Sequence, residues 1–324
     1  MKRKVIFDTD PGIDDSMAML LAHASSEIEL MGITTVFGNA TIENATRNAL
    51  YIKQRFGLTA DVAMGADTPL VVAAGEPTTF VHGLNGLGDI DIPAAEYHGI
   101  DKRAAHDYII DSVKAHPGEI TLIAVGRLTN LALAVEKDPS IAGLVKEVIV
   151  MGGAFGHNGH TGNVTPFAEA NIIGDPHAAD RVMTTDWPVT VVGLDVTQQT
   201  VMTGEYIDRL RLDSARYGEF IYRITRFYAD FHQREMGMEG FYVHDSSAIV
   251  YAIAPELFDV KVGAIRVITE GPAIGHTLLK EGGNVTRLMS GAGNRSNVFA
   301  FRLITRGCLI SIWRPWWKRR RFSF

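Results

Sequence analysis

The feature that most restricts the fold is an alternation of short apolar runs with amphipathic stretches through the first two-thirds of the chain. The apolar runs are rich in Val and Ile, which is typical of strands that are buried on both faces. Strands that alternate with helices at this spacing form a largely parallel sheet. We expect strands over residues 5–7, 29–36, 120–125, 145–151 and 189–194.

The stretches between these runs repeat their apolar residues with the period of a helix. We expect helices over residues 16–23, 43–55 and 128–136, and longer ones near residues 203–212, 218–235 and 245–254. No internal repeat and no Pro/Ser-rich linker divides residues 1–300, so one large domain is expected there. The sequence thus predicts an α/β fold with a single open, mostly parallel sheet and helices on both of its faces.

Composition narrows the class of protein. Of the 324 residues, 46% are hydrophobic and 21% are charged, which is the balance of a globular protein. No apolar stretch reaches the ~20 residues that a membrane span needs. The N-terminus reaches Asp8 after only three apolar residues, too few for a signal-peptide core, so we expect a cytoplasmic protein. A single cysteine, Cys308, excludes an internal disulfide and a cysteine-based metal cluster.

Charge is distributed unevenly along the chain. The last 24 residues hold seven of the 31 Lys and Arg residues and none of the 37 Asp and Glu residues, so residues 1–300 are strongly acidic. An acidic body is a poor binder of polyanions, because phosphate contacts need clustered Lys and Arg. We therefore expect a small neutral or cationic ligand or a metal ion, and neither nucleic acid nor membrane, as its partner.

Residues 301–324 form an atypical basic tail. This tail contains three of the four tryptophans, Trp313, Trp316 and Trp317, together with the only cysteine. Two interpretations remain open for it. One is contact with an anionic membrane or a nucleic acid, and the other is a change of reading frame. All candidate site residues lie upstream of the tail.

Polar residues follow the predicted strands. In open parallel sheets the ligand lies beyond the carboxyl ends of the strands, so these residues are expected to meet at one edge. The sequence therefore predicts a polar crevice lined with acids. Its expected residues are Asp8, Asp10, Asp14 and Asp15 after the first strand, Gly38 and Asn39 after the second, then Val125, Gly126, Met151, Gly152, Gly153 and Asp195.

The strongest local pattern is Asp8-Thr-Asp-Pro-Gly-Ile-Asp-Asp15, with four carboxylates in eight residues. Crowded carboxylates either share protons or bind a cation. Oxygen ligands without His or Cys favour Ca²⁺ or Mg²⁺ over Zn²⁺. The simpler alternative is a helix cap followed by a solvated acidic turn.

The Asp-x-Asp pair at Asp8 and Asp10 also resembles the start of the haloacid-dehalogenase-type phosphatases, in which the first Asp attacks phosphorus. That family has Thr or Val two residues after the second Asp, where this chain has Gly12. Asp14 and Asp15 would in addition repel a phosphate group. A phosphatase is kept as the minority alternative.

Over about residues 4–295 the chain resembles the inosine–uridine preferring nucleoside hydrolases. The resemblance implies a Rossmann-like sheet, a bound Ca²⁺, and hydrolysis of the N-glycosidic bond of purine and/or pyrimidine ribonucleosides to free base and ribose. It also implies a homodimer or homotetramer and a role in nucleoside catabolism or salvage. The matching blocks, in order, are residues 8–15, 38–39, 82–88, 126–130, 151–153, 162–171, 175–176, 193–197 and 244–245.

The resemblance also implies roles for individual residues. Calcium would be held by the carboxylates of Asp10, Asp15 and Asp245 and by the carbonyl of Val125. Asp10 would serve as general base on the metal-bound water, and His244 would protonate the leaving base. The implied substrate contacts are Asp14, Asn39, Asn163, Glu169 and Asn171 for the ribose and His82 for the base. Tyr228 and His232 lie four residues apart on one face of an expected helix before His244, so we expect them to line the base pocket as well.

Ordinary structural roles compete with these assignments. A lone Asn in a loop is most often a cap, and Tyr228 and His232, four residues apart, could simply pack one helix face. Arg127, Ala170 and Ser246 depart from the residues usual in the family, which leaves pocket shape and base preference open. A non-catalytic Ca²⁺- or nucleoside-binding protein on the same scaffold is the second hypothesis.

Overall fold

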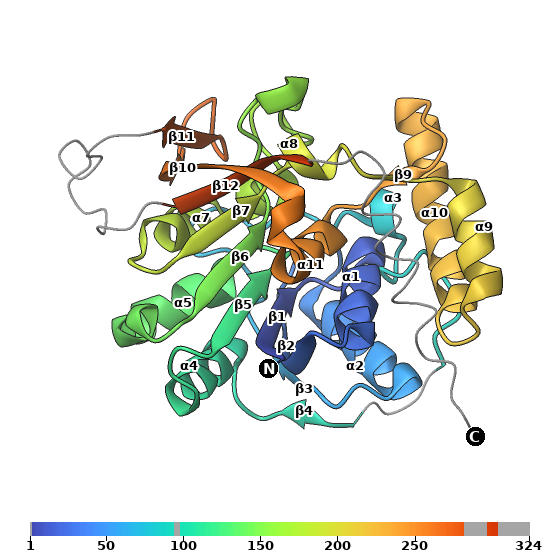
Figure 1. Cartoon of the computed structure of the whole chain (residues 1–324), viewed down its shortest axis with the longest axis horizontal. Helices are drawn as coiled ribbons and strands as arrows, with labels where there is room; N and C mark the ends of the chain where they lie inside the picture. Colours follow the sequence, from blue (N-terminus) through green and yellow to red (C-terminus); the bar gives the residue numbers. More distant parts are fainter. Residues whose placement is uncertain (1, 94–97, 282–296, 304–324) are drawn as a thin grey trace.

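The computed structural model describes residues 2–93, 98–281 and 297–303, the last of these for their backbone only. The predictions for the basic tail therefore fall almost entirely outside the described residues. The described part contains a ten-stranded sheet of order β11-β10-β12-β7-β6-β5-β1-β2-β3-β4 (Figure 1). Its strands are β1 (Arg3–Thr9), β2 (Ile28–Thr35), β3 (Asp61–Met64), β4 (Ile100–Asp101), β5 (Ile120–Ala124), β6 (Glu147–Met151), β7 (Val189–Val192), β10 (Phe258–Val267), β11 (Thr277–Glu281) and β12 (Asn297–Leu303).

Along the sheet, neighbouring strands pair in parallel from β12 through β7, β6, β5, β1, β2 and β3 to β4. Only β10 runs antiparallel to its neighbours, β11 and β12. This confirms the predicted single open, mostly parallel sheet. A second sheet of two short antiparallel strands, β8 (Val201–Met202) and β9 (Phe241–Tyr242), was not predicted. Strands β3, β4 and β10–β12 were also not predicted.

Helices cover both faces of the sheet, as expected (Figure 1). Side chains of β1 alternate between the two layers, because Val5 and Phe7 join one hydrophobic cluster and Ile6 joins the other. Burial on both sides explains why the predicted strands read as continuous apolar runs. One layer contains α1 (Ile13–Ala24), α2 (Ile42–Phe56), α9 (Gly204–Asp213), α10 (Gly218–Met236) and α11 (Asp245–Ile253), and the other α4 (Ala105–Ala115), α5 (Thr129–Lys137) and α7 (Pro176–Thr184).

Local signals set the ends of these elements. Thr41 caps α2 by accepting a hydrogen bond from the Asn44 amide at 3.3 Å, and Gly57 ends the helix in the left-handed conformation at φ 65°. The expected strand over residues 189–194 was two residues too long. Gly193 caps the short helix α8 (Leu194–Thr197), so the backbone turns there.

The order of the strands places a crevice at the end of β1. The chain runs from β1 through β2 and β3 to β4, then returns to the opposite side of β1 as β5. Such a reversal of strand order leaves an opening between β1 and β5 at the carboxyl ends of these strands. Two further short helices border this end of the sheet, α3 (Thr79–His82) and α6 (Ala170–Gly174). None of the helices in the described ranges is long and apolar enough to cross a membrane.

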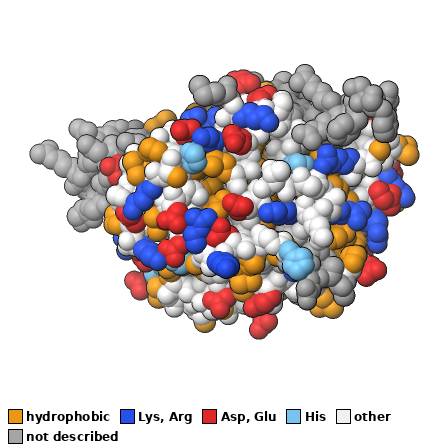
Figure 2. Space-filling view, turned by 90° about the horizontal axis from the view of Figure 1, so that it is seen from below, with side chains coloured by type: hydrophobic (Ala, Val, Ile, Leu, Met, Phe, Trp, Pro, Cys, Tyr) orange, Lys and Arg blue, Asp and Glu red, His pale blue; other side chains and the backbone are white. Residues whose placement is uncertain are grey.

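Charge differs between the surface and the interior. On the face shown in Figure 2, acidic and basic side chains are interspersed. Among the buried charged residues, acids dominate, and Arg127 is the one Lys or Arg in the described ranges that is buried. The buried acids are Asp8, Asp10, Asp14, Asp15, Glu169, Asp175, Asp195 and Asp245. Much of the negative charge noted in the sequence is therefore internal.

Candidate active site

The loop between β1 and α1 is wrapped around the carboxylate of Asp15. This carboxylate accepts hydrogen bonds from the Thr9 hydroxyl at 2.6 Å, the Gly12 amide at 3.0 Å and the Asp10 amide at 3.2 Å. It also accepts one from the side-chain amide of Asn39 at 2.9 Å. These bonds fix the path of the loop, so its other acids are held in defined positions.

Three buried acids meet in what we call the acid trio, Asp14, Asp15 and Asp245. One carboxylate oxygen of each lies within 4.8 Å of the others. Burial, together with repulsion by Asp15, raises the pKa of Asp14 to about 8, and burial with repulsion by Asp14 raises the pKa of Asp245 well above its usual range. Carboxylates crowded in this way are stabilised by a cation, and an all-oxygen donor set fits a hard divalent ion.

Asp10 lies beside the acid trio and has a different environment. Its Oδ2 accepts hydrogen bonds from the Asn39 amide at 2.7 Å and from Nη1 of Arg127 at 2.5 Å. Its Oδ1 is buried and has no hydrogen-bond partner among the described residues. Burial and the charge of Asp15 raise the pKa of Asp10, and the charge of Arg127 opposes this rise. One oxygen is thus held and the other is left for a ligand.

The opposite side of the pocket is built at the ends of β5 and β6. The side-chain amide of Asn171, in α6, donates to the carbonyl of Val125 at 2.8 Å. Glu169 caps α6 by accepting the Asn171 amide at 3.0 Å, and it also accepts the Gly153 amide at 3.0 Å. Asn163 Oδ1 accepts a backbone amide of the same helix at 3.0 Å. The capping role considered for Asn163 is therefore present, and its side chain lines the pocket as well.

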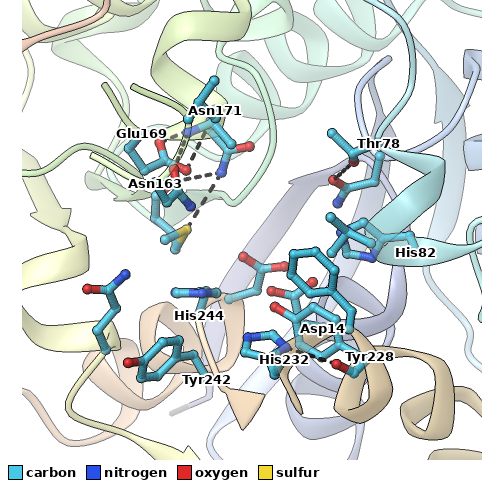
Figure 3. Close-up of a pocket in the computed structure, with 18 of the residues that line it drawn as sticks. Asp14, Thr78, His82, Asn163, Glu169, Asn171, Tyr228, His232, Tyr242 and His244 are labelled. Carbon is cyan, nitrogen blue, oxygen red and sulfur yellow. Dashed lines mark hydrogen bonds between the residues drawn. The ribbon is translucent and has the colours of Figure 1, made fainter. Parts of the chain in front are cut away.

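Most of these acids and amides border one pocket, whose empty volume is about 820 Å³ with its open mouth included. Asn163, Glu169 and Asn171 face Tyr228 and His232 of α10 across the hollow (Figure 3). Every substrate contact expected from the sequence lines this pocket: Asp14, Asn39, His82, Asn163, Glu169, Asn171, Tyr228 and His232. Val125, His244 and Asp245 line it too, whereas Asp10 and Asp15 lie behind its wall.

Further lining residues were missed by sequence reasoning. They include Thr78, Phe80, Gln198, Phe231, Met236 and Tyr242. Three of these had a usable signal. Phe231 lies next to His232, Met236 follows His232 by four residues on the same helix, and Tyr242 lies two residues before His244. The others reach the pocket from segments whose positions depend on tertiary packing.

Two histidines of the pocket carry their ring protons on different nitrogens. Nδ1 of His82 accepts the Ile13 amide at 3.1 Å, so its proton is on Nε2. Nδ1 of His232 lies 2.9 Å from the carbonyl oxygen of Tyr228, so it carries the proton and leaves Nε2 as an acceptor. The ring of His82 also stacks on Tyr228, with centroids 5.6 Å apart. The pocket wall therefore offers one ring donor, one ring acceptor and an aromatic face.

His244 precedes α11 and Asp245. Its Nδ1 lies 2.8 Å from the hydroxyl of Thr197. Burial, with repulsion from His232 and His82, lowers the pKa of His244 to about 3, and burial lowers the pKa of His82 to about 4. These rings are therefore neutral at pH 7, and each still has one N–H group to donate.

Comparison with known proteins identifies the family. A family model described as inosine-uridine preferring nucleoside hydrolase matches residues 5–305. The chain belongs to this family. Uridine nucleosidase 1 of Arabidopsis thaliana is 43% identical to it over 280 residues, which cover 86% of this chain and 82% of that protein.

Solved structures agree with this assignment. A plant nucleoside hydrolase superposes with a TM-score of 0.91 at 37% identity, covering 98% of this chain and 100% of the other. A purine-preferring ribonucleoside hydrolase from Gardnerella vaginalis gives 0.87 at 33% identity, covering 98% and 99%. The expected family, fold and enzyme class, an N-glycosyl hydrolase, are confirmed. Nucleoside hydrolases typically use a metal ion, and the acid trio could bind one.

Proposed function

We propose that this nucleoside hydrolase cleaves the N-glycosidic bond of ribonucleosides with the help of Ca²⁺, with Asp10 as general base and His244 as the donor to the leaving base. The observation that carries the proposal is the composition of one pocket. Buried acids form one part of its lining, which we call the acidic end, and neutral histidine and tyrosine rings form the adjoining part, which we call the base end. A ribosyl group that develops positive charge fits the acidic end, and a planar base fits the base end.

Calcium would be held by Asp10, Asp15 and Asp245 through their carboxylates and by Val125 through its carbonyl, with Asp14 next to Asp15 and Asp245 in the acid trio. The orphaned Oδ1 of Asp10 and the crowding of the acid trio support this set. A bound Ca²⁺ lowers the pKa of a coordinated water and, because it accepts 6–8 oxygens in a loose geometry, leaves room for ribose hydroxyls.

Asp10 takes a proton from the attacking water on Oδ1. Its other oxygen, Oδ2, is held by Asn39 and Arg127, which limits rotation of the carboxylate. The transition state of glycoside cleavage resembles an oxocarbenium ion. Asp14 and Asp245, buried at the same end of the pocket, stabilise the positive charge that develops on the sugar.

The ribose contacts are Asp14, Asn39, Asn163, Glu169 and Asn171, which surround the acidic end of the pocket. Sites that expect hydroxyls reject deoxy sugars, because their buried polar groups would be left unpaired. We therefore expect hydrolysis of ribonucleosides in preference to 2′-deoxyribonucleosides.

The leaving base lies between His82, Tyr228 and His232. The Thr197 hydroxyl donates to Nδ1 of His244, so the ring carries its proton on Nε2 and donates it to the base as the bond to the sugar breaks. We propose that the substrates are purine ribonucleosides, pyrimidine ribonucleosides or both. The names of the relatives point in both directions, since one is a uridine nucleosidase and another is described as purine-preferring. Uridine and inosine are therefore the first substrates to test.

The test is release of reducing sugar from a panel of nucleosides, with and without a calcium chelator. Ribose from uridine or inosine that is lost with the chelator and restored by Ca²⁺ supports the proposal. Nucleoside binding without ribose release would favour the non-catalytic binding protein. Phosphate release from nucleotides with Mg²⁺ would favour the phosphatase. A homodimer or homotetramer, which the family resemblance implies, is proposed as well and is measured by light scattering.

A further inference from the structure

We propose that Arg127 is a positioning residue, which holds the Asp10 carboxylate in its working orientation and weakens metal binding in doing so. The proposal rests on the function proposed above, because it assigns Arg127 a part in the same site. Three observations support it: the contact of Arg127 with Asp10, the space that nearby glycines leave for the guanidinium, and the charges around the guanidinium.

The contact joins a buried cation to a buried acid. Nη1 of Arg127 donates to Oδ2 of Asp10 at 2.5 Å, and Arg127 is 7% exposed whereas Asp10 is fully buried. Oδ2 also accepts the Asn39 amide at 2.7 Å. Two donors on one oxygen resist rotation of the carboxylate about its Cβ–Cγ bond. The unpaired Oδ1 is therefore kept in a single direction.

Glycines make room for the guanidinium. A Cβ atom on Gly38 would lie 2.1 Å from Nη1 of Arg127, and one on Gly174 would lie 2.6 Å from its Nε. A side chain at either position would therefore displace the guanidinium from Asp10. Nε of Arg127 is buried without a hydrogen-bond partner among the described residues. Such an unpaired donor opposes folding, so a purely structural role explains this placement poorly.

The charge of Arg127 acts on the metal site as well as on Asp10. Burial raises the pKa of Glu169 and lowers that of His82, and the positive charge of Arg127 acts to lower the pKa of both groups. A divalent ion beside Asp10 would be repelled by the guanidinium, and it would share the Asp10 carboxylate with it. Removal of this charge is thus expected to strengthen metal binding while it frees the carboxylate to rotate.

The experiment compares R127Q with the parent enzyme, using calcium titration calorimetry on chelator-treated protein and steady-state kinetics with uridine and inosine. For R127Q the Kd for Ca²⁺ is expected to fall by about threefold or more, because a like charge is removed. Its kcat is expected to fall by about tenfold or more, because Asp10 is misoriented. KM should change by less than about threefold, since no contact to the nucleoside is lost.

Two further variants control the result. R127K keeps the charge but not the planar fork, so its Kd for Ca²⁺ should match the parent and its kcat should lie between those of the parent and R127Q. R266Q removes an Arg whose Nε and Nη2 contact Asp180 at 2.7 and 2.8 Å, on the far side of the sheet from α10. It should alter neither Kd nor kcat.

Weaker calcium binding by R127Q, or an unchanged kcat, would overturn the proposal. If R127Q does not fold, as judged by circular dichroism, R127K decides: parental kcat in R127K overturns the positioning role, and reduced kcat with parental Kd supports it. If the parent enzyme releases no ribose, the proposed function fails. The calcium titration of the same variants then still tests the effect of the Arg127 charge by itself.

Discussion

The two ends of the pocket are built by opposite physical strategies. The acidic end concentrates charge, with Asp10 and the acid trio buried beside a single guanidinium. The base end contains His82, Tyr228, His232 and His244, whose rings are kept neutral by burial. The difference indicates a division of work. In the function proposed above, charge is placed where a metal ion and a developing sugar cation would bind, and neutral hydrogen-bonding rings are placed where a planar base would leave.

The rings of the base end stay neutral although the buried acids lie close to them. The charge of Asp15 acts to raise the pKa of His82, but burial acts more strongly, and the pKa falls to about 4. Tyr228 is also kept neutral, since burial and the nearby acids raise its pKa well above the usual range. A negative site can therefore lie next to rings that stay uncharged at pH 7.

The largest expected effect tests the acidic end. Asp10→Asn keeps the shape of the side chain but removes the base, so kcat for uridine and inosine should fall by up to about 10⁴-fold. The measurement is release of reducing sugar, with circular dichroism to confirm folding. Asp180→Asn, which alters an Arg–Asp pair away from the pocket, is the matched control. An Asp10→Asn enzyme within about tenfold of the parent would remove Asp10 from the role of base.

Removal of the metal is expected to have the next largest effect. Dialysis against a calcium chelator should lower kcat by about 10³-fold, because a Lewis acid supplies several kcal/mol of transition-state stabilisation. Calcium should restore activity better than Mg²⁺, which demands a tighter octahedral shell. Calcium should also raise the Tm, since the folded site binds it. Full activity after exhaustive chelation would show that the acid trio works without a metal.

The two ends also differ in how well the sequence predicts them. Asp8 to Asp15 are eight consecutive residues at the end of β1, the loop after it and the start of α1, so their spacing was enough to predict a crowded acidic site. Tyr228 and His232 could be paired as well, because residues four apart share a helix face. Gln198, by contrast, directly follows the short helix α8, and no local pattern indicated that this segment reaches the pocket.

The contact between Asp10 and Arg127 shows why part of the site could not be predicted. The two residues are 117 positions apart, and they meet because β1 pairs with β5, with Asp8 opposite Ala124. Strand order is set by packing of whole layers and not by any one segment. The parallel strands that were predicted are each a continuous apolar run. β10 was missed because its residues alternate in burial and it lacks such a run.

Acid titration separates the base end from the acidic end. The pKa of His82 is lowered from 6.5 to about 4 in the folded protein. Between these pH values the unfolded chain binds a proton that the folded protein does not, so this histidine costs stability as the pH falls through that window. His82→Asn keeps an acceptor for the Ile13 amide but cannot titrate.

Chemical denaturation of the parent and of His82→Asn at pH 7 and pH 4 measures how much unfolding free energy the His82 ring costs at low pH. The parent should lose up to about 3 kcal/mol more unfolding free energy than His82→Asn on going to pH 4. The comparison uses the difference between the two proteins. The acids with raised pKa values make both proteins more stable as the pH falls, so their contribution cancels in this difference. Equal losses in the two proteins would show that the ring of His82 is not held neutral.

The smallest expected effect concerns His244. A neutral imidazole that donates to a leaving base acquires a charge-assisted hydrogen bond only as the base becomes anionic, which is worth about 2 kcal/mol. His244→Gln should therefore lower kcat for uridine by about 30-fold. With p-nitrophenyl β-D-ribofuranoside, whose leaving group needs no proton, the loss should shrink to less than about threefold. Equal losses on both substrates would assign His244 to the geometry of the acidic end, through its neighbour Asp245, and the division between the two ends of the pocket would no longer hold.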